Sequence, residues 1–324
     1  MTGSATSAEL PVRLVCCVAN PSIDKTADVE RLVPGAIHRP SHLTMLPGGK
    51  GLNIARAATT LGTPVEAVLL LAGHAGAWVD AALATRGIAR TVAWTAGETR
   101  TCLSIHDRSA GTLTEVYEAG PELDRAAWEG LQSALGSALE RGGPAVVAIG
   151  GSLPPGAPGD GHARLAALAT GRGHRAIVDT GGAGLLAALA TGPWLAKCNA
   201  AEAGEATGLD TAGVDGALAA ARALRTAGAG AAIVTLGTAG AVLAIDSGTW
   251  RIGPPPELGT YAVGSGDAFL AGLVHGVLGG GSLEEAARLG AAVAAANALV
   301  PGQGELRLED VERLRPRIEL TAAP

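Results

Sequence analysis

Short apolar segments alternate with alanine-rich segments over most of the chain, and this alternation limits the folds that are open to it. The apolar segments are rich in aliphatic residues and end at glycine or polar residues, as buried strands do. Consecutive strands that are joined through helices run parallel, so the helices cover both faces of one sheet. We therefore predict an α/β fold with a mostly parallel central sheet and with ligands at the carboxyl ends of its strands. The expected strands span residues 13–19, 65–71, 145–149, 176–179, 194–197, 231–236 and 241–245.

Two early segments break this alternation. Residues 26–46 are polar and interrupted by Pro34, Gly35 and Pro40, and residues 91–117 form a run of short apolar stretches with polar ends. Such patterns are typical of small exposed strands rather than of core elements. Because no low-complexity linker divides the 324 residues, we expect one domain that carries both segments as insertions.

The charge of the chain argues against two classes of partner. Its formal net charge is -6 and only 17% of its residues are charged, whereas binding to nucleic acid or to an anionic membrane through the overall field needs a positive surface. Aromatic residues make up 2% of the chain, so the stacking platforms of single-strand binders are also missing. We expect no nucleic-acid partner and no membrane partner, and any phosphate must be held by local groups.

Cysteine and histidine usage favours a reduced protein without a zinc site. The four cysteines include no CxxC pair, and the histidines have no spacing typical of zinc ligands. The first apolar run, residues 12–19, is short and contains Arg13, and no apolar run of about 18 residues follows it. We therefore expect a cytoplasmic protein without a signal peptide or a transmembrane helix.

A glycine-hinged turn leads into an apolar helix within residues 261–276. The free N–H groups at the start of a helix, together with the helix dipole, form an anion site when small residues let a phosphate approach. Gly264, Ser265 and Gly266 are small enough for this, and Asp267 in the same turn could accept a proton from an incoming hydroxyl, as kinase catalytic aspartates do. On these residues alone, a simple helix cap is an equally good interpretation of Asp267.

Other glycine loops carry less information, because 48 glycines make chance GxG matches frequent. Residues 47–51 form a second glycine loop before a helix, but Lys50 is followed by Gly51 rather than by the Ser or Thr of a Walker A loop. Residues 182–187 imitate a dinucleotide fingerprint after a strand that ends at Asp179. Since the Asp179 carboxylate would repel a pyrophosphate, a nicotinamide-dependent oxidoreductase is the weaker interpretation.

Charged and polar side chains collect where the expected strands end and helices begin. Lysine and arginine there could hold the fixed charges of a substrate and a nucleotide, and asparagine and glutamate could position hydrated magnesium. These are the parts that phosphoryl transfer needs. The set comprises Asp24, residues 48–53, Arg100, Ser152, Lys197, Asn199, Glu202, Gly237 and Asp267.

These residues resemble the PfkB family of ribokinase-like sugar kinases, in the branch of the 1-phosphofructokinases and tagatose-6-phosphate kinases. The resemblance covers almost the whole chain and keeps the family's order of motifs. It implies a ribokinase-like three-layer α/β/α sandwich with a small β lid, formed by residues 22–45 and 91–118 and often used for dimerisation. The matching segments are Asn20-Pro-Ser-Ile-Asp24, Pro47-Gly-Gly-Lys-Gly-Leu-Asn53, Gly97-Glu-Thr-Arg100, Gly151-Ser-Leu-Pro-Pro-Gly156, residues 197–202, residues 235–240 and Val263-Gly-Ser-Gly-Asp267.

The resemblance also implies an activity, which is transfer of the γ-phosphoryl group of ATP, with Mg²⁺, to a hydroxyl of a phosphorylated ketohexose. Asp267 would be the general base, and Gly264, Ser265 and Gly266 would form the anion hole. The positions implied for the sugar and its phosphate are Asp24, Arg39, Gly49, Lys50, Asn53, Arg100 and Ser152. The positions implied for the nucleotide are Lys197, Asn199, Thr235, Gly237, Gly240 and Asn297, with Glu202 holding the metal through water.

Two positions depart from the family pattern. Cys198 stands where a proline is usual, and Ala262 replaces a frequent threonine, a change that bears on ATP affinity and on dependence on monovalent ions. Segments 99–105 and 114–121 look closer to tagatose-6-phosphate kinases than to 1-phosphofructokinases, so the expected substrate is a ketohexose phosphate with a lean toward tagatose 6-phosphate. A non-catalytic sugar-phosphate sensor on the same fold is a second alternative.

Overall fold

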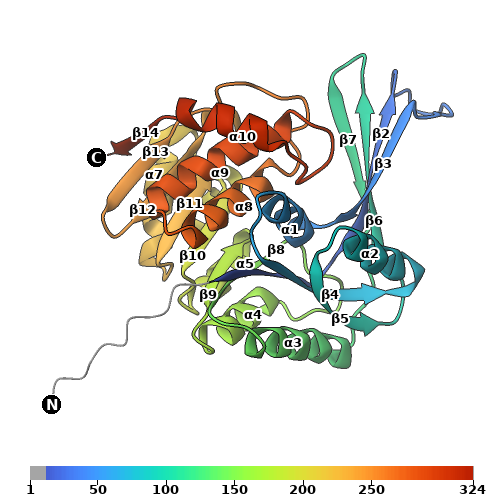
Figure 1. Cartoon of the computed structure of the whole chain (residues 1–324), viewed down its shortest axis with the longest axis horizontal. Coiled ribbons are helices and arrows are strands. Elements are labelled where there is room, and N and C mark those ends of the chain that lie inside the picture. Colours follow the sequence, from blue (N-terminus) through green and yellow to red (C-terminus); the bar gives the residue numbers. More distant parts are fainter. Residues whose placement is uncertain (1–11, 324) are drawn as a thin grey trace.

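A ten-stranded sheet forms the centre of the computed structural model, which describes residues 12–323 (Figure 1). Its strand order is β14-β13-β12-β11-β10-β9-β8-β1-β4-β5. The strands from β5 to β11 in this order are parallel, and β12, β13 and β14 add an antiparallel edge. The predicted mostly parallel sheet is therefore confirmed. Its strands are β1 (Arg13–Val18), β4 (Val65–Ala72), β5 (Ala89–Thr95), β8 (Ala145–Gly150), β9 (Arg175–Asp179), β10 (Leu195–Asn199), β11 (Ala231–Thr235), β12 (Ala241–Ile245), β13 (Gly248–Ile252) and β14 (Leu320–Ala323).

Helices cover both faces of the sheet, and each face has its own hydrophobic core. In β1, Leu14 and Cys16 join one core while Val15 and Cys17 join the other, because neighbouring strand residues point to opposite faces. This is the expected three-layer sandwich. The first face carries α1 (Lys50–Thr60), α2 (Gly73–Thr85), α8 (Ser265–Leu278), α9 (Leu283–Ala298) and α10 (Leu308–Leu314). The second carries α3 (Arg125–Glu140), α4 (Gly161–Thr170), α5 (Gly182–Leu189), α6 (Ala200–Thr207) and α7 (Gly213–Thr226).

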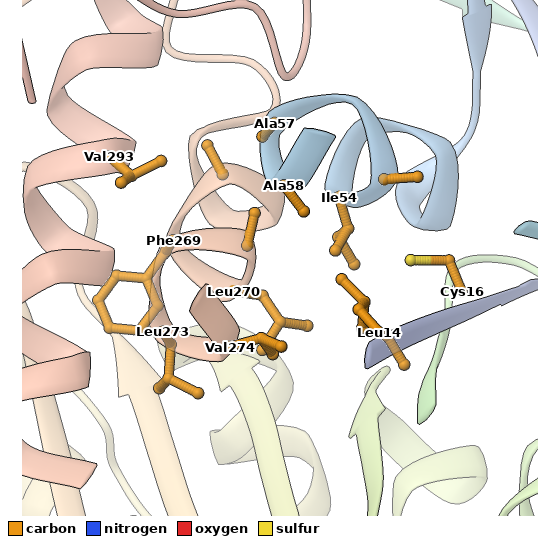
Figure 2. Close-up of a cluster of buried hydrophobic side chains, with 14 of the residues drawn as sticks. Leu14, Cys16, Ile54, Ala57, Ala58, Phe269, Leu270, Leu273, Val274 and Val293 are labelled. Atoms are coloured by element: carbon orange, nitrogen blue, oxygen red, sulfur yellow. The ribbon is translucent and has the colours of Figure 1, made fainter. Parts of the chain in front are cut away.

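Helix α8 is packed on the sheet between α1 and α9. Figure 2 shows Leu270 of α8 on the side that faces Leu14 of β1 and Ile54 of α1. On the side toward α9, a Cβ added at Gly272 would lie 2.7 Å from a methyl carbon of Val293, so glycine at this position lets the two helices approach closely. These contacts with β1, α1 and α9 hold α8, and with it the first turn of this helix, in place on the sheet.

A second, four-stranded sheet stands beside the sandwich (Figure 1). It consists of β2 (Ser22–Val29), β3 (His42–Gly48), β6 (Arg100–Asp107) and β7 (Thr112–Tyr117), in the order β3-β2-β6-β7. We call it the lid. The expected lid segment 91–118 is wrong at its start, because β5 pairs in parallel with β4 in the central sheet. As an edge strand, β5 is only partly buried, which explains why its sequence resembles that of a lid strand.

No helix in the described part of the chain, residues 12–323, is long and apolar enough to cross a membrane. The N-terminal residues 1–11, which the sequence predicts to contain no signal peptide, lie outside the described residues.

The packing of α8 predicts the effect of Leu270→Ala on stability. Leu270 is completely buried, so the truncation leaves a cavity and should lower the free energy of unfolding by about 2–5 kcal/mol in urea titrations. Leu186→Ala is the control, since Leu186 on α5 is 46% exposed. Equal losses in the two variants would contradict the proposed role of α8 packing.

Candidate active site

The topology brings separate motifs to one end of the central sheet. The carboxyl ends of β1, β8, β9 and β10 lie next to one another in the strand order, and parallel strands present their following loops at the same edge. The first turns of α1 and α8 meet there, and Lys50 of α1 interacts with Asp179 at the end of β9. This edge therefore holds the candidate active site.

The turn before α8 has the geometry of an anion site. Gly264 is the residue before the first turn, with a φ of 85°, and a Cβ there would lie 2.9 Å from Cα of Gln303. Both the left-handed backbone and the close approach require glycine. No side chain caps this helix, and the Ser265 N–H donates to the Ala262 carbonyl, so the N–H groups that follow Ser265 in the first turn are the ones left to an anion. The interpretation of Asp267 as a cap is therefore not supported.

Asp267 lies in the first turn of α8 and is 8% exposed. The Asn53 side-chain amide donates a hydrogen bond to Asp267 Oδ2 at 2.9 Å. Burial raises the pKa of Asp267 to about 6, against the opposing effect of the nearby Lys50 ammonium. A carboxylate with such a pKa, beside a helix start, is suited to accept a proton near neutral pH.

Arg56, which the sequence motifs do not single out, positions Asn53. Its guanidinium donates to Asn53 Oδ1 at 2.9 Å, and to the backbone carbonyls of Gln303 and Pro47. Arg56 is 2% exposed, and this burial lowers its pKa to about 10. An arginine within the run Ile54-Ala-Arg-Ala-Ala58, where the other residues are apolar, is the signal that could have identified it.

Asp179 joins two of the predicted lysines. Its Oδ1 accepts a hydrogen bond from Lys50 Nζ at 2.8 Å and its Oδ2 accepts one from Lys197 Nζ at 2.8 Å. Lys197 Nζ would lie 3.3 Å from a Cβ added at Gly266, so this ammonium is next to the first turn of α8. From the sequence alone, the Asp179 carboxylate is only an obstacle to a pyrophosphate. Its position at a strand's carboxyl end is the signal that could have included it.

On the lid side, Asp24 is held at the base of β2. Ser22 Oγ donates to Asp24 Oδ1 at 2.6 Å, and burial raises the pKa of Asp24 above its ordinary value. Gly48 packs against this carboxylate, since a Cβ at Gly48 would lie 2.0 Å from it. Gly49, with a φ of 96°, is the residue before α1.

The arginines and Ser152 are placed differently from one another. Arg100, at the base of β6, donates to the backbone carbonyls of Asn20 and Glu118, and Ser152 Oγ accepts from the Asn20 amide at 3.1 Å. Ser22 pairs with Gly48 at the end of the β2–β3 hairpin that lies near Asp24. Arg39 is in the loop at the other end of this hairpin, and its side chain is exposed. The structure therefore brings Arg100 and Ser152, but not Arg39, next to the base of the lid.

A cavity of about 270 Å³ opens beside the turn of residues 263–267, which we call the anion turn. One wall is the alanine-rich face of α9, and Phe269 of α8 also lines the cavity. An apolar cleft with a few polar groups is typical of nucleotide and cofactor sites. The predicted site residues that line the cavity are Thr235, Gly237, Gly240, Ser265 and Gly266.

Asn199 and Asn297, predicted for the nucleotide, and Glu202, predicted for the metal, form hydrogen bonds with other groups of the protein. Asn199 and Glu202 form a capping box at the start of α6, in which Asn199 Oδ1 accepts from Glu202 N at 2.9 Å and Glu202 Oε2 accepts from Asn199 N at 2.8 Å. Asn297 is completely buried; it donates to the carbonyls of Tyr261 and Val263 and accepts from Gly304 N. The amide of Asn297 therefore holds the anion turn, and its position near an adenine stays a prediction.

The donor atoms around the site suit a hydrated metal ion rather than a closed metal centre. Among residues 12–323, no three His, Cys, Asp or Glu side chains are grouped so that they could hold a metal. Mg²⁺ usually keeps several waters and binds one or two carboxylates together with substrate phosphates. Glu202, which interacts electrostatically with Lys50 at this edge, fits such a water-mediated contact.

These features define a phosphotransferase site on a ribokinase-like fold. Comparison with known proteins places it in a family: the sequence profile of the pfkB family carbohydrate kinases matches residues 12–310. The chain belongs to the PfkB family of carbohydrate kinases, enzymes that transfer a phosphoryl group to an alcohol. This membership removes the support for a nicotinamide-dependent oxidoreductase.

Individual relatives agree with this assignment. The chain is 36% identical over 290 residues to a 1-phosphofructokinase of Xanthomonas campestris pv. campestris, covering 87% of this chain and 90% of the relative. It is 32% identical over 325 residues to an ATP-dependent 6-phosphofructokinase isozyme 2 of Mycobacterium tuberculosis, covering 100% and 94%. Phosphofructokinase-2 of Escherichia coli, solved with substrates and products, superposes with a TM-score of 0.87 at 28% identity and covers 94% of this chain and 99% of its own.

The contact between Gly48 and Asp24 predicts a selective effect on the sugar. In Gly48→Ala the added methyl group would displace the Asp24 carboxylate, and we expect KM for the sugar substrate to rise about tenfold or more, since tenfold corresponds to only about 1.4 kcal/mol. KM for ATP should not change in steady-state assays. Gly159→Ala is the control, because a Cβ at Gly159 meets no atom within 4 Å. Equal changes in both KM values would contradict a local effect on Asp24.

Proposed function

We propose that the protein transfers the γ-phosphoryl group of ATP to a free hydroxyl of a phosphorylated ketohexose and forms a bisphosphate, with Asp267 as the general base. The observation that carries this proposal is the position of Asp267. Its carboxylate accepts a hydrogen bond from Asn53 of residues 47–53, which we call the sugar motif, while its own backbone belongs to the anion turn. A hydroxyl next to Asp267 would therefore face a phosphate held by that turn.

The phosphate side of the proposed reaction is electrostatic. ATP would occupy the cavity between α9 and the 235–240 loop, with its terminal phosphate against the first turn of α8. The N–H groups of this turn and the ammonium groups of Lys50 and Lys197 would stabilise the charge on the transferring group. Mg²⁺, held through water by Glu202, would neutralise part of the phosphate charge.

The hydroxyl side needs one proton acceptor. The Asp267 carboxylate would take the proton of the attacking hydroxyl while the oxygen bonds to the γ-phosphorus and ADP leaves. Asn53 would keep the carboxylate aligned, and Arg56 would keep Asn53 in place through the hydrogen bond between them. Asp24, at the base of the lid, would accept hydrogen bonds from other sugar hydroxyls.

Fructose phosphates are the leading substrates. The relatives at 36% and 32% identity are named 1-phosphofructokinase and ATP-dependent 6-phosphofructokinase isozyme 2, which supports fructose 1-phosphate or fructose 6-phosphate. Tagatose 6-phosphate, which the sequence pattern favours, stays a candidate in the same assay. Arg100 would meet the existing phosphate, because it lies at the base of the lid and carries a fixed positive charge.

The lid also supports a homodimer. Register places Met45, Lys25, Leu103 and Val116 side by side on the face opposite Asp24, because alternate strand residues share a face. Met45 is 39% exposed and Val116 58% exposed. A partly exposed row of three apolar side chains and one lysine can serve as a contact surface, and we propose that two lids pack through it.

Turnover with defined sugars tests the proposed reaction. We expect ADP release with at least one of fructose 1-phosphate, fructose 6-phosphate and tagatose 6-phosphate, and none with the unphosphorylated sugars. Asp267→Asn should lower kcat by about 10²–10⁴-fold, which is the usual contribution of a positioned base. Full activity of Asp267→Asn would refute its role, and thermal stabilisation by a phosphosugar without any turnover would indicate a sensor instead.

The pH dependence of kcat/KM tests the state of the base. Asp267 must be deprotonated to accept a proton, so activity should fall as the pH decreases through about 6, the raised pKa of this carboxyl. The hydrogen bond from Asn53 lowers that pKa, so Asn53→Ala should move the acid limb to higher pH. An acid limb near 3.8, the ordinary value for an aspartate, would show that the group is not the buried Asp267.

A further inference from the structure

We propose that Asp179 is a positioning residue for phosphoryl transfer, which sets the two lysine ammonium groups beside the transferring phosphate. This inference rests on the proposed function and extends it to a residue outside the sequence motifs. Asp179 does not contact the substrate in this proposal. It acts through Lys50, which is the first residue of α1, and through Lys197, which belongs to β10.

The geometry uses both oxygens of Asp179. Oδ1 accepts from Lys50 Nζ and Oδ2 accepts from Lys197 Nζ, each at 2.8 Å. Asp179 and Lys197 are withdrawn from water, with side-chain exposures of 2% and 5%, and Lys50 is partly buried at 26%. The carboxylate therefore fixes the separation of two cations that come from distant parts of the chain.

The strand register explains why this residue can do so. Asp179 pairs with Lys197 on one side and with Gly150 on the other. A Cβ at Gly150 would lie 2.3 Å from the Asp179 carbonyl oxygen, so the neighbouring strand end fits closely against the backbone of Asp179. With its backbone held between two strands, its short side chain has little freedom, unlike the flexible stems of the lysines.

Asp179 offsets one of the two ammonium charges, so these three side chains together keep one positive charge, which faces the carboxylates of Asp267 and Glu202. The cluster can therefore attract phosphate oxygens while each buried lysine keeps a partner in the absence of ligand. Lys197 Nζ lies next to Gly266 in the first turn of α8. The excess charge is thus available beside the N–H groups that would receive the γ-phosphate.

Asp179 also influences Asp267 through space. The groups that act on Asp267 are the cations Lys50, Lys197 and Arg56, the anion Asp179 and the thiol Cys16. The negative charge of Asp179 raises the pKa of Asp267, whereas Lys50 and Lys197 lower it. Removal of the Asp179 charge should therefore move the acid limb of kcat/KM to lower pH, a change that a purely structural residue would not cause.

The first test is Asp179→Asn with a matched control. We expect kcat to fall about 100-fold, the usual effect of misplaced catalytic groups by about 1 Å, together with the shift of the acid limb. Glu66→Gln is the control. Glu66 also joins two cations, Arg13 at 2.7 Å and Arg141 at 2.9 Å, but it lies at the amino end of β4, on the edge of the sheet opposite the candidate active site. Its loss should lower stability and leave kcat and the pH profile unchanged.

A double-mutant cycle separates action through the lysines from an independent role. If Asp179 works by holding Lys50, then Asp179→Asn in the Lys50→Met background should cost at most about tenfold in kcat instead of about 100-fold. Effects that multiply in the double variant would overturn the proposal, as would an Asp179→Asn enzyme with unchanged kcat and acid limb. If Asp179→Asn does not fold, Asp179→Glu keeps the charge but displaces both oxygens. This variant should fold and lose kcat, and full kcat would overturn the proposal.

The proposed function can fail separately. A wild-type enzyme that releases no ADP with any phosphosugar refutes the reaction before any variant is made. A wild type that turns over beside a fully active, folded Asp179 variant refutes only the role of Asp179.

Discussion

The buried carboxylate of Asp267 sets the requirements that the surrounding structure meets. A carboxylate removed from water is costly unless fixed donors or cations surround it. Here those groups are the Asn53 amide and the Lys50 ammonium, both of α1, and the Lys197 ammonium of β10. Packing of α8 against β1, α1 and α9 brings Asp267 to them. The hydrophobic core and the charge arrangement therefore depend on the same helix.

A tightly packed loop connects the two helix starts. Gln303 lies against Gly264 of the anion turn, and Gly304 lies against the backbone of Asn53. Arg56 holds the Gln303 carbonyl and Asn297 holds the Gly304 N–H, so both sides of the loop are tied by buried polar side chains. These bonds inside a low-dielectric region fix the distance between the sugar motif and the anion turn.

The sequence predicts the sheet, its ligand edge and the site motifs because these follow from short-range patterns: apolar strands, glycine turns and polar residues after strands. It does not predict the strand order, so β5 is mistaken for part of the lid and β13 and β14 are missed. It also cannot show which polar groups bind each other. Asn297 and Arg39 both stand at positions that the family resemblance assigns to ligands. In the fold, Asn297 is completely buried and Arg39 is exposed at the far end of the lid hairpin.

Asp179 illustrates the difference between a motif and an electrostatic role. Considered with the glycine loop that follows it, its charge argues against a bound pyrophosphate, and that argument treats the carboxylate as unpaired. In the fold, two lysines turn the same charge into part of a cluster with a net positive charge. The sign of the local field at a strand end therefore depends on residues that are distant in sequence, since Lys50 lies 129 positions and Lys197 18 positions from Asp179. The Asp179 carboxylate alone would repel a phosphate, whereas the folded cluster of Asp179, Lys50 and Lys197 can attract one.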